Sequence, residues 1–195
     1  MYLSETKRNE YIQYIKPLLT EKRFLHTLST EKMAIKLASS SGENIADAQT
    51  AALLHDSYKC IDPGIKLQYA EKFNIPPNSL QELGTDIIHG QIAANMVKTD
   101  LNIRDENILN AIAFHTTGRP GMSRLEKIIY SADVVEESRV YDVADLLREA
   151  VYKDIDSGTY LVMNHVLQFL LKSNKPIYHL TVEAYNALLK EQKEI

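Results

Sequence analysis

Four histidines and two aspartates stand at or near the inward edge of successive predicted helices. They are His26, His55, Asp56, His89, His115 and Asp133. Imidazole nitrogens and carboxylate oxygens that meet from separate helices are the ligands with which helical proteins build metal sites in their cores. Six ligands suit two ions better than one. The set predicts a buried site for a pair of metal ions, in which further hydrogen bonds orient each ligand.

The two aspartates are the members of this set that an apolar core tolerates least. Asp133 follows Ile129 by four positions and Leu125 by eight, so it lies on their helical stripe. The apolar run "AALL" likewise leads directly into His55 and Asp56. Because an unpaired carboxylate is costly to bury, both aspartates need a cation, and a metal ion would supply it.

Each of these residues also has an ordinary structural explanation. A single helical histidine is more often a hydrogen-bonded core or surface residue than a metal ligand. Asp133 alone could pair with a lysine or arginine, and Asp56 could cap a helix or a turn. We prefer the metal hypothesis because it replaces several separate explanations with one.

Apolar residues recur at intervals of three and four along nearly the whole chain, which predicts an all-α fold, a helical bundle. We expect helices at about 5–19, 21–39, 44–54, 65–73, 86–98 and 106–116, after Ser123, and at 143–155, 157–173 and 181–193. Asn44 and Asp105 are predicted N-caps, and Ser123 with Glu126 matches a capping box.

Two of the helices show a clear apolar stripe that we expect to face inward. In the 21–39 helix the stripe is Leu25, Leu28, Ile35 and Ala38. In the helix after Ser123 it is Leu125, Ile128, Ile129 and Ala132. We expect one domain over residues 1–195, with a metal-binding core at about 21–140 and further helices at about 141–195.

The composition is that of an ordinary globular protein, with 45% hydrophobic and 25% charged residues. Charges throughout the N-terminal segment argue against a signal peptide or a membrane span. A single cysteine, Cys60, excludes an internal disulfide and fits a reducing compartment, so we expect a cytoplasmic protein. The formal charge of -4 and the lack of a basic block argue against binding to duplex nucleic acid.

The order of the motifs resembles the HD-domain metal-dependent phosphohydrolases. The matching stretches are "FLHTL" with His26, "LLHD" with His55 and Asp56, "IIHG" with His89, "AFHTTG" with His115 and "IIYSADVVE" with Asp133. "HDSYK" through Lys59, "HTTGRPGMSRLEKIIYSAD" and Arg139 are similar to the YqeK-type branch, bacterial symmetrical diadenosine tetraphosphate hydrolases. The similarity covers about residues 20 to 140. The chain departs from the family pattern at one position: where Glu-Pro is expected, Glu136 is followed by Glu137. The difference affects the bend expected before Arg139.

The resemblance implies a dinuclear centre. One ion would be held by His26, His55, Asp56 and Asp133, and the second by Asp56, His89 and His115, with Asp56 bridging. Iron is the metal that the resemblance favours, with manganese or another transition metal as alternatives. The implied reaction is cleavage of diadenosine tetraphosphate to two ADP by a metal-bound hydroxide, with Asp56 and Lys59 as catalytic residues.

A polyphosphate also needs cationic side chains, and those near the motifs are Lys59, Arg119, Lys127 and Arg139. Lys59 is preferred, because it lies about one helical turn past Asp56. The alternative interpretation is that Lys127 and Arg139 are ordinary surface charges. The loop residues Thr116, Thr117 and Gly118 could offer hydroxyl or backbone N–H groups to phosphate, although a helix C-terminus explains Gly118 equally well.

Two other functions stay open at this point. The protein could hydrolyse a different nucleotide or phosphoester, or it could be a metal-stabilised nucleotide sensor without turnover. The helices after residue 141 could close the pocket or form a homodimer interface. His165, in an apolar helix outside the ordered set, is interpreted as structural.

Overall fold

The computed structural model describes residues 1–76 and 84–193. Its elements are α1 (Glu5–Ile15), the 3-10 turn η1 (Lys16–Leu18), α2 (Glu21–Ser41), α3 (Ile45–Leu54), α4 (Pro63–Lys72), α6 (His89–Asp100), α7 (Glu106–Phe114), α8 (Arg124–Val135), α9 (Ala144–Lys153), α10 (Ile155–Lys172) and α11 (His179–Lys193). Within the described ranges there is no β-strand, so the predicted all-α fold is confirmed.

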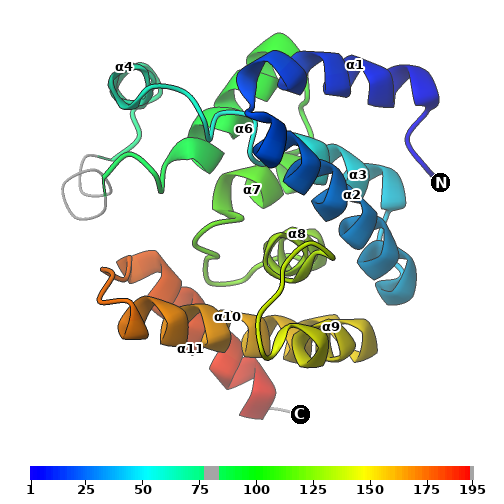
Figure 1. Ribbon diagram of the computed structural model, residues 1–195, viewed down its shortest axis with the longest axis vertical. Helices are drawn as coiled ribbons and strands as arrows, with labels where there is room; N and C mark the ends of the chain where they lie inside the picture. Colours follow the sequence, from blue (N-terminus) through cyan, green and yellow to red (C-terminus); the bar gives the residue numbers. More distant parts are fainter. Residues whose placement is uncertain (77–83, 194–195) are drawn as a thin grey trace.

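Helix α8 lies at the centre of the bundle. It is seen end-on near the middle of Figure 1, and it packs against α2, α3 and α7 of the upper layer and against α9 and α10 of the lower one. Its predicted stripe has no exposed surface: Leu125, Ile128, Ile129 and Ala132. Burying a leucine or isoleucine side chain contributes roughly 1.5 to 3 kcal/mol, so this stripe holds the two layers together.

The predicted caps are present and fix where three helices begin. Asn44 accepts a hydrogen bond from the N–H of Ala46, and Asp105 accepts from the first turn of α7. Ser123 Oγ accepts from the N–H of Glu126 at 3.2 Å, while the Glu126 carboxylate accepts from the N–H of Ser123 at 2.8 Å. These caps set the register of α3, α7 and α8, and thereby the direction of the ligands that those helices carry.

The prediction for the inward stripe of α2 was wrong at Leu25, which is 58% exposed. The buried residues of this helix are His26, Thr27, Thr30, Glu31, Met33, Ala34, Leu37 and Ala38. Leu25 precedes His26 and lies about 100° around the helix from it, away from the core, whereas Thr27 and Thr30 lie with His26 on the buried side. The polar residue takes the inward position, as expected where a buried polar site needs it.

Two helix boundaries differ from the expected ones for local reasons. Helix α1 ends at Ile15 because Pro17 cannot donate the hydrogen bond that would continue it. Helix α6 begins at His89 rather than near residue 86, since residues 85–88 form turns. His89 therefore stands in the first turn of its helix.

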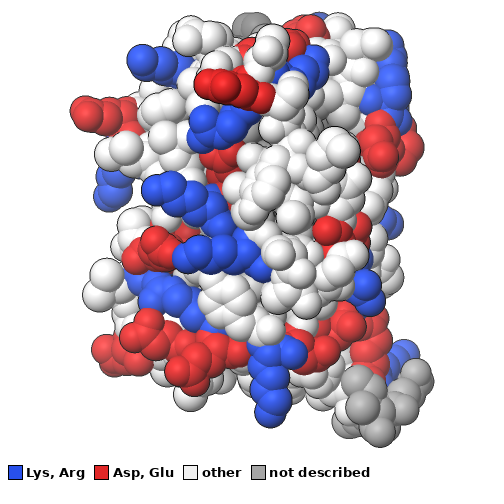
Figure 2. Space-filling view, turned by 90° about the vertical axis from the view of Figure 1, so that its right-hand side faces the viewer, with Lys and Arg blue, Asp and Glu red and all other residues white. Residues whose placement is uncertain are grey.

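Charges of both signs are mixed on the molecular surface. On the face shown in Figure 2, lysine and arginine side chains lie among aspartates and glutamates rather than in one basic surface. In the part of the chain that the structure describes, no helix is both long and apolar enough to cross a bilayer.

Candidate metal centre

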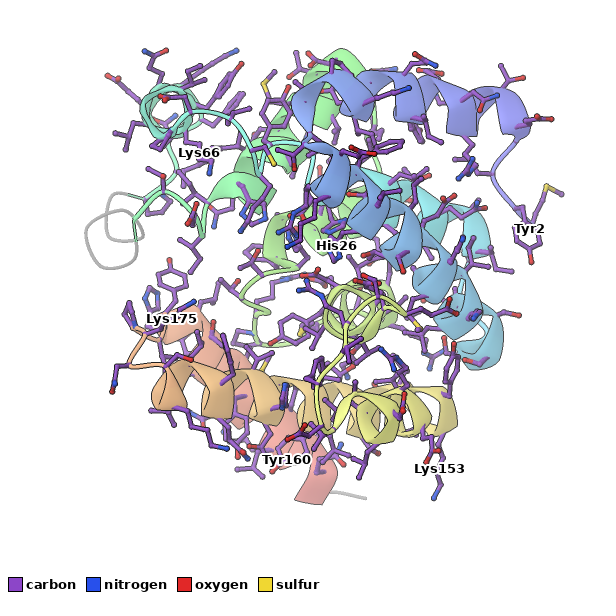
Figure 3. The ribbon with its side chains drawn as sticks, in the orientation of Figure 1. Tyr2, His26, Lys66, Lys153, Tyr160 and Lys175 are labelled. Atoms are coloured by element: carbon purple, nitrogen blue, oxygen red, sulfur yellow. The ribbon has the colours of Figure 1, made fainter. Side chains whose placement is uncertain are left out.

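The structure brings the six predicted ligands together between the two layers. His26 comes from α2, His55 and Asp56 from the end of α3, His89 from α6, His115 from the end of α7 and Asp133 from the last turn of α8. They form overlapping triads whose ligand atoms lie within 4.8 Å of one another. Five of the six are buried, and the Asp133 side chain is 21% exposed. Figure 3 shows His26 pointing into the interior from α2.

The two oxygens of Asp56 face two different pairs of histidines. Oδ1 lies 2.9 Å from Nε2 of His89 and 3.5 Å from Nε2 of His115. Oδ2 lies 3.5 Å from Nε2 of His55 and 3.8 Å from Nε2 of His26. A carboxylate placed in this way can bind one cation with each oxygen, so its geometry is that of a bridging ligand.

Asp133 completes the group on the Oδ2 side of Asp56. Its Oδ1 lies 2.8 Å from Nε2 of His26 and 4.0 Å from Nε2 of His55. Ligand atoms about 2.1 Å from one ion lie roughly 3.0 to 3.4 Å from each other in octahedral or tetrahedral geometry. Four of the six separations, 2.8 to 3.5 Å, are close to these values and occur on both sides of Asp56. The two others, from Nε2 of His26 to Asp56 and from Nε2 of His55 to Asp133, are longer, at 3.8 and 4.0 Å.

Hydrogen bonds at Nδ1 fix how the four imidazoles are oriented. In three of them Nδ1 lies within hydrogen-bond distance of the backbone carbonyl three residues earlier, at 2.6 Å for His55, 2.6 Å for His89 and 2.8 Å for His115. A carbonyl only accepts, so each Nδ1 donates and each Nε2 is left with its lone pair toward the centre. His26 is oriented through Nδ1 by the Glu136 carboxylate, at 3.0 Å. Such outer partners are typical of metal-binding histidines.

The arrangement of the imidazoles fits bound cations better than it fits an uncharged core. Nε2 of His89 and Nε2 of His115 lie 3.0 Å apart, and in the neutral tautomers their lone pairs would repel each other. Nε2 of His55 is buried and has no hydrogen-bond partner within the described residues, and Nε2 of His26 is buried against the Asp133 carboxylate at 2.8 Å. Burial lowers the pKa of His89 to about 4, which keeps its imidazole in the neutral form that binds metals. The nitrogen-rich set suits divalent transition metals.

The carboxylates make this part of the core favourable for positive charge. Burial opposes the ionisation of Asp56, but the surrounding imidazoles, His55 first, outweigh it and hold its pKa well below the usual range. Burial alone would lower the pKa of His26, yet the carboxylates of Asp133 and Glu136 raise it to about 9. The same carboxylates that favour a proton at Nε2 of His26 also favour a metal cation there.

Glu136 is a site residue that the sequence reasoning did not assign. It has no exposed surface, and its carboxylate accepts from Ser138 N–H at 2.7 Å as well as holding His26. Burial raises the pKa of Glu136, but these hydrogen bonds outweigh burial and lower it to about 2. One signal was available, since Glu136 follows Asp133 by three positions, about one helical turn.

The bend after α8 forms without the proline that the resemblance led us to expect. Helix α8 ends at Val135, and an extended backbone at Glu136 turns the chain so that Glu137 points outward and pairs with Lys36. The Arg148 guanidinium stabilises the bend, because it donates to the carbonyls of Val135, Glu136 and Arg139.

Arg23 is a second residue that the sequence reasoning missed. Its Nη1 donates to Oδ2 of Asp56 at 2.8 Å, and its side chain is 29% exposed. It precedes His26 by three positions, so both side chains leave α2 on the same side. The guanidinium offsets the charge of the Asp56 carboxylate from outside the imidazole cluster.

Comparison with known proteins assigns the fold and the centre to one family. The HD domain family matches residues 23–149, a range that contains all six ligands. This chain belongs to the HD domain family. The symmetrical bis(5'-nucleosyl)-tetraphosphatase of Halalkalibacterium halodurans is 37% identical over 186 residues, covering 95% of this chain and 99% of that protein. The Bacillus subtilis protein of the same name is 33% identical over 182 residues, covering 93% and 97%.

A solved structure agrees with the family assignment. It is a predicted HD superfamily hydrolase involved in NAD metabolism from Clostridium acetobutylicum, 32% identical, with a TM-score of 0.87. The match covers 98% of this chain and all of that one. With the family shown and the donor set in place, the His/Asp cluster is a binding site for divalent metal.

A pocket of about 610 Å³ adjoins the metal centre of the HD domain. Three of the predicted substrate-binding residues line it: Lys59, Thr116 and Arg139. Lys59 is half-buried and forms no ion pair among the described residues, and burial lowers its pKa. Arg139 is 41% exposed and is held by the side chain and the backbone carbonyl of Asp133, at 3.3 and 3.2 Å.

Two other predicted phosphate-binding cations are paired elsewhere. Arg119 makes a two-pronged contact with Glu126, at 2.6 and 3.0 Å. Lys127 is 6% exposed and lies between Asp156 and Glu191, at 2.7 and 2.8 Å. Neither is among the residues that line the pocket. Their charges are already compensated, so the structure does not bring them to the site.

Of the three predicted phosphate-binding residues in the loop after α7, one lines the pocket and two do not. The Thr116 hydroxyl lies 3.1 Å from Nε2 of His115, at the pocket wall. Thr117 is buried and donates to the carbonyl of Gly118 at 2.8 Å. The N–H of Gly118 donates to the Phe114 carbonyl at 2.7 Å, so this glycine ends the helix as its alternative explanation predicted.

The sequence reasoning did not place His165 at the pocket that its ring lines beside the metal centre, and the interpretation of this residue as structural stays a prediction. The apolar residues of α10 hid this, since only one face of the helix packs on α8 and α9. His165 lies on a partly exposed face of the helix.

Proposed function

We propose that this protein hydrolyses diadenosine tetraphosphate symmetrically to two ADP molecules. The observation that carries the proposal is the position of Asp56, whose two oxygens face separate histidine pairs beside a pocket lined by Lys59. The alignment over 95% of the chain with a symmetrical bis(5'-nucleosyl)-tetraphosphatase supports this substrate.

We propose two divalent ions at the centre, with iron as the metal and manganese or another transition metal as alternatives. His26, His55 and Asp133 would hold one, His89 and His115 the other, and Asp56 both. When bound, two such ions lower the pKa of coordinated water and stabilise charge on the attacking and leaving oxygens. The split between the two oxygens of Asp56 supports two ions rather than one.

The side chains of the pocket would then bind and orient the phosphates. Lys59 offers an ammonium that forms no salt bridge within the described residues, and charge-assisted hydrogen bonds to phosphate are the strong ones. Arg139 is held in place by Asp133, so little side-chain entropy is lost when it contacts an oxygen. Arg23 keeps the charge of Asp56 partly offset.

The bond to be cleaved is the central phosphoanhydride. Water adds its oxygen to one of the two inner phosphorus atoms and loses a proton. The bond from that phosphorus to the bridging oxygen breaks, and the bridging oxygen leaves with the other half as a terminal oxygen of the second ADP. Both products are then ADP. Cleavage at any other bond gives unequal products, so product identity reports where the phosphates are held.

The decisive experiment is elemental analysis of anaerobically purified protein, followed by turnover on the same sample with chromatography of the products. We expect about two metal equivalents per chain, mainly iron, and ADP as the only product. AMP plus ATP, or no turnover by metal-loaded protein, would contradict the proposal.

A second substrate class is worth including in the same panel. The solved HD-family neighbour is described as involved in NAD metabolism, so NAD and its nucleotide precursors should be assayed beside the dinucleoside polyphosphates. Preferred turnover of NAD or its precursors would replace the proposed substrate, while the proposed metal-dependent hydrolysis would stay the same. Nucleotide binding without any turnover would favour a sensor. We place the activity in the cytoplasm, given the single cysteine and the nucleotide substrate.

A further inference from the structure

The pocket beside the metal centre has two walls of different chemistry. One wall is charged and belongs to the HD domain, with Lys59 and Arg139. The other is aromatic, with Tyr141 at the end of the HD match and His165 and Phe169 on α10. The proposed phosphates need only the first wall.

Tyr141 and His165 already form a stack. Their ring centroids are 4.7 Å apart, and the ring planes differ by 12°. The Tyr141 hydroxyl donates to the Val134 carbonyl at 3.1 Å, which ties the ring to the end of α8 next to Asp133. Because both rings are ordered in the free protein, a third flat ring can join them with little loss of side-chain entropy.

Phe169 extends the aromatic wall toward the mouth of the pocket. It follows His165 by four positions on α10, so the two side chains lie on the same face of the helix. Its side chain is 52% exposed, and the Lys175 ammonium lies 5.3 Å from its ring centroid. Figure 3 shows Lys175 at the turn between α10 and α11, on the same side of the molecule as α4.

An exposed aromatic ring beside an ordered stack, in a pocket that ends at cations, matches a ligand with a flat apolar part and a phosphate part. We propose that Tyr141, His165 and Phe169 form the subsite for the nucleoside, with the base against this wall and the phosphates directed to Lys59 and Arg139. The proposal rests on the proposed function for the identity of the ligand as a nucleotide.

The assignment gives α10 and α11 a role. Helix α10 lies beyond residue 149, where the family match ends, yet it supplies His165 and Phe169. The HD domain would then provide the metal and phosphate sites, while the C-terminal helices close the pocket and recognise the nucleoside. The sequence left two roles open for these helices, closing the pocket and forming a homodimer interface, and the proposal favours the first.

The test compares a nucleotide with a phosphate ligand that has no base. Binding of ADP and of inorganic pyrophosphate to metal-loaded protein is measured by calorimetry for the wild type, His165→Ala and Phe169→Ala. Loss of base stacking on an aromatic ring should weaken ADP binding roughly 5- to 100-fold. Pyrophosphate affinity should stay within about twofold, because the charged wall is intact.

Two further variants control for indirect effects. Leu171→Ala removes an exposed side chain from the same helix, outside the pocket lining, and should bind both ligands as the wild type does. Phe169→Tyr keeps the ring and should retain ADP affinity. Thermal unfolding of every variant checks that the fold is preserved.

Unchanged ADP affinity in both alanine variants, or an equal loss for ADP and pyrophosphate, would overturn the subsite. The proposed function fails by a separate result, namely no hydrolysis of diadenosine tetraphosphate by the wild type. If that occurs while the alanine variants still lose ADP selectively, the nucleoside subsite stands and the reaction must be sought elsewhere.

Discussion

The metal centre and the aromatic wall of the adjoining pocket are constructed in opposite ways. Each histidine of the centre is buried and is held at Nδ1 by a second group, as His55 is by a backbone carbonyl. The aromatic wall uses rings that stay partly exposed, such as Phe169, and two of its rings, Tyr141 and His165, are stacked on each other.

This difference separates chemistry from recognition within one small protein. Ligands that share partners depend on one another, so the loss of one charge disturbs the whole centre. Rings on a helix face act more independently and should give graded effects. The centre lies inside the region common to the HD family, whereas α10 lies outside it.

The largest effect is expected from Asp56→Asn, which keeps the shape of the side chain and removes the shared charge. We expect loss of bound metal and a fall in kcat on the order of 10³-fold, because metal-ion stabilisation of the transition state amounts to several kcal/mol. Elemental analysis and turnover on the same preparation measure both.

The matched control is Asp145→Asn, which removes a 92% exposed carboxylate whose surface ion pair contributes little. It should keep both metal and activity. Full metal content in Asp56→Asn would mean that the carboxylate does not bridge, and the contrast between the two regions would lose its basis.

Lys59→Met tests the border between the two regions. A hydrogen bond to a charged group contributes about 1.5 to 3 kcal/mol, so kcat/KM should fall about 10- to 100-fold while metal content stays unchanged. Lys153→Met, at an exposed position of α9, is the control and should behave as the wild type. Loss of metal along with activity would assign Lys59 to the centre instead of the pocket.

The ligand set was predictable because its members obey local rules. Asp133 lies on the stripe of Leu125 and Ile129, and the capping box at Ser123 fixes that register. A helical period together with a cap therefore fixes the inward direction of a polar residue before any tertiary contact is known. The helices and the convergence of the six residues follow from such local information, whereas the role of each as a metal ligand stays a prediction.

The ion-pair partners of cationic side chains such as Lys127 were not predictable from local patterns. Lys127 pairs with Asp156 and Glu191, which lie 29 and 64 positions away in the sequence. His165 has the apolar neighbours of a core residue, yet its own face borders the pocket. Such assignments depend on how helices dock, which no local pattern encodes. The single-domain division at about residue 140 stays a prediction.

Glu136 and Glu137 form a natural matched pair, because adjacent residues of the same type point in opposite directions. Glu136 orients His26 from inside, while Glu137 is 57% exposed and pairs with Lys36. Glu136→Gln should weaken metal binding about 10- to 100-fold, the usual effect of losing an outer partner of a ligand. Glu137→Gln should leave metal affinity unchanged in the same titration. Equal affinities for the two variants would exclude Glu136 from the centre.

Gly118, in the loop after α7, packs against α10 and α11, and its substitution gives the smallest expected effect on the reaction. Its φ of 65° strains any residue with a side chain, and a Cβ would lie 2.6 Å from Met163 of α10 and 3.2 Å from Ala184 of α11. Gly121 has a φ of 68° but open space around it. Gly121→Ala should therefore cost only the backbone strain, about 1 to 2 kcal/mol.

Gly118→Ala should add roughly 1 to 3 kcal/mol of overpacking to that strain, measured as the difference in free energy of unfolding between the two variants in urea. Below its unfolding transition its KM should match the wild type, because the Gly118 N–H is already bonded to Phe114. A raised KM without loss of stability would instead place this N–H among the phosphate contacts. Gly118 would then contact the substrate phosphates, in addition to packing against α10 and α11.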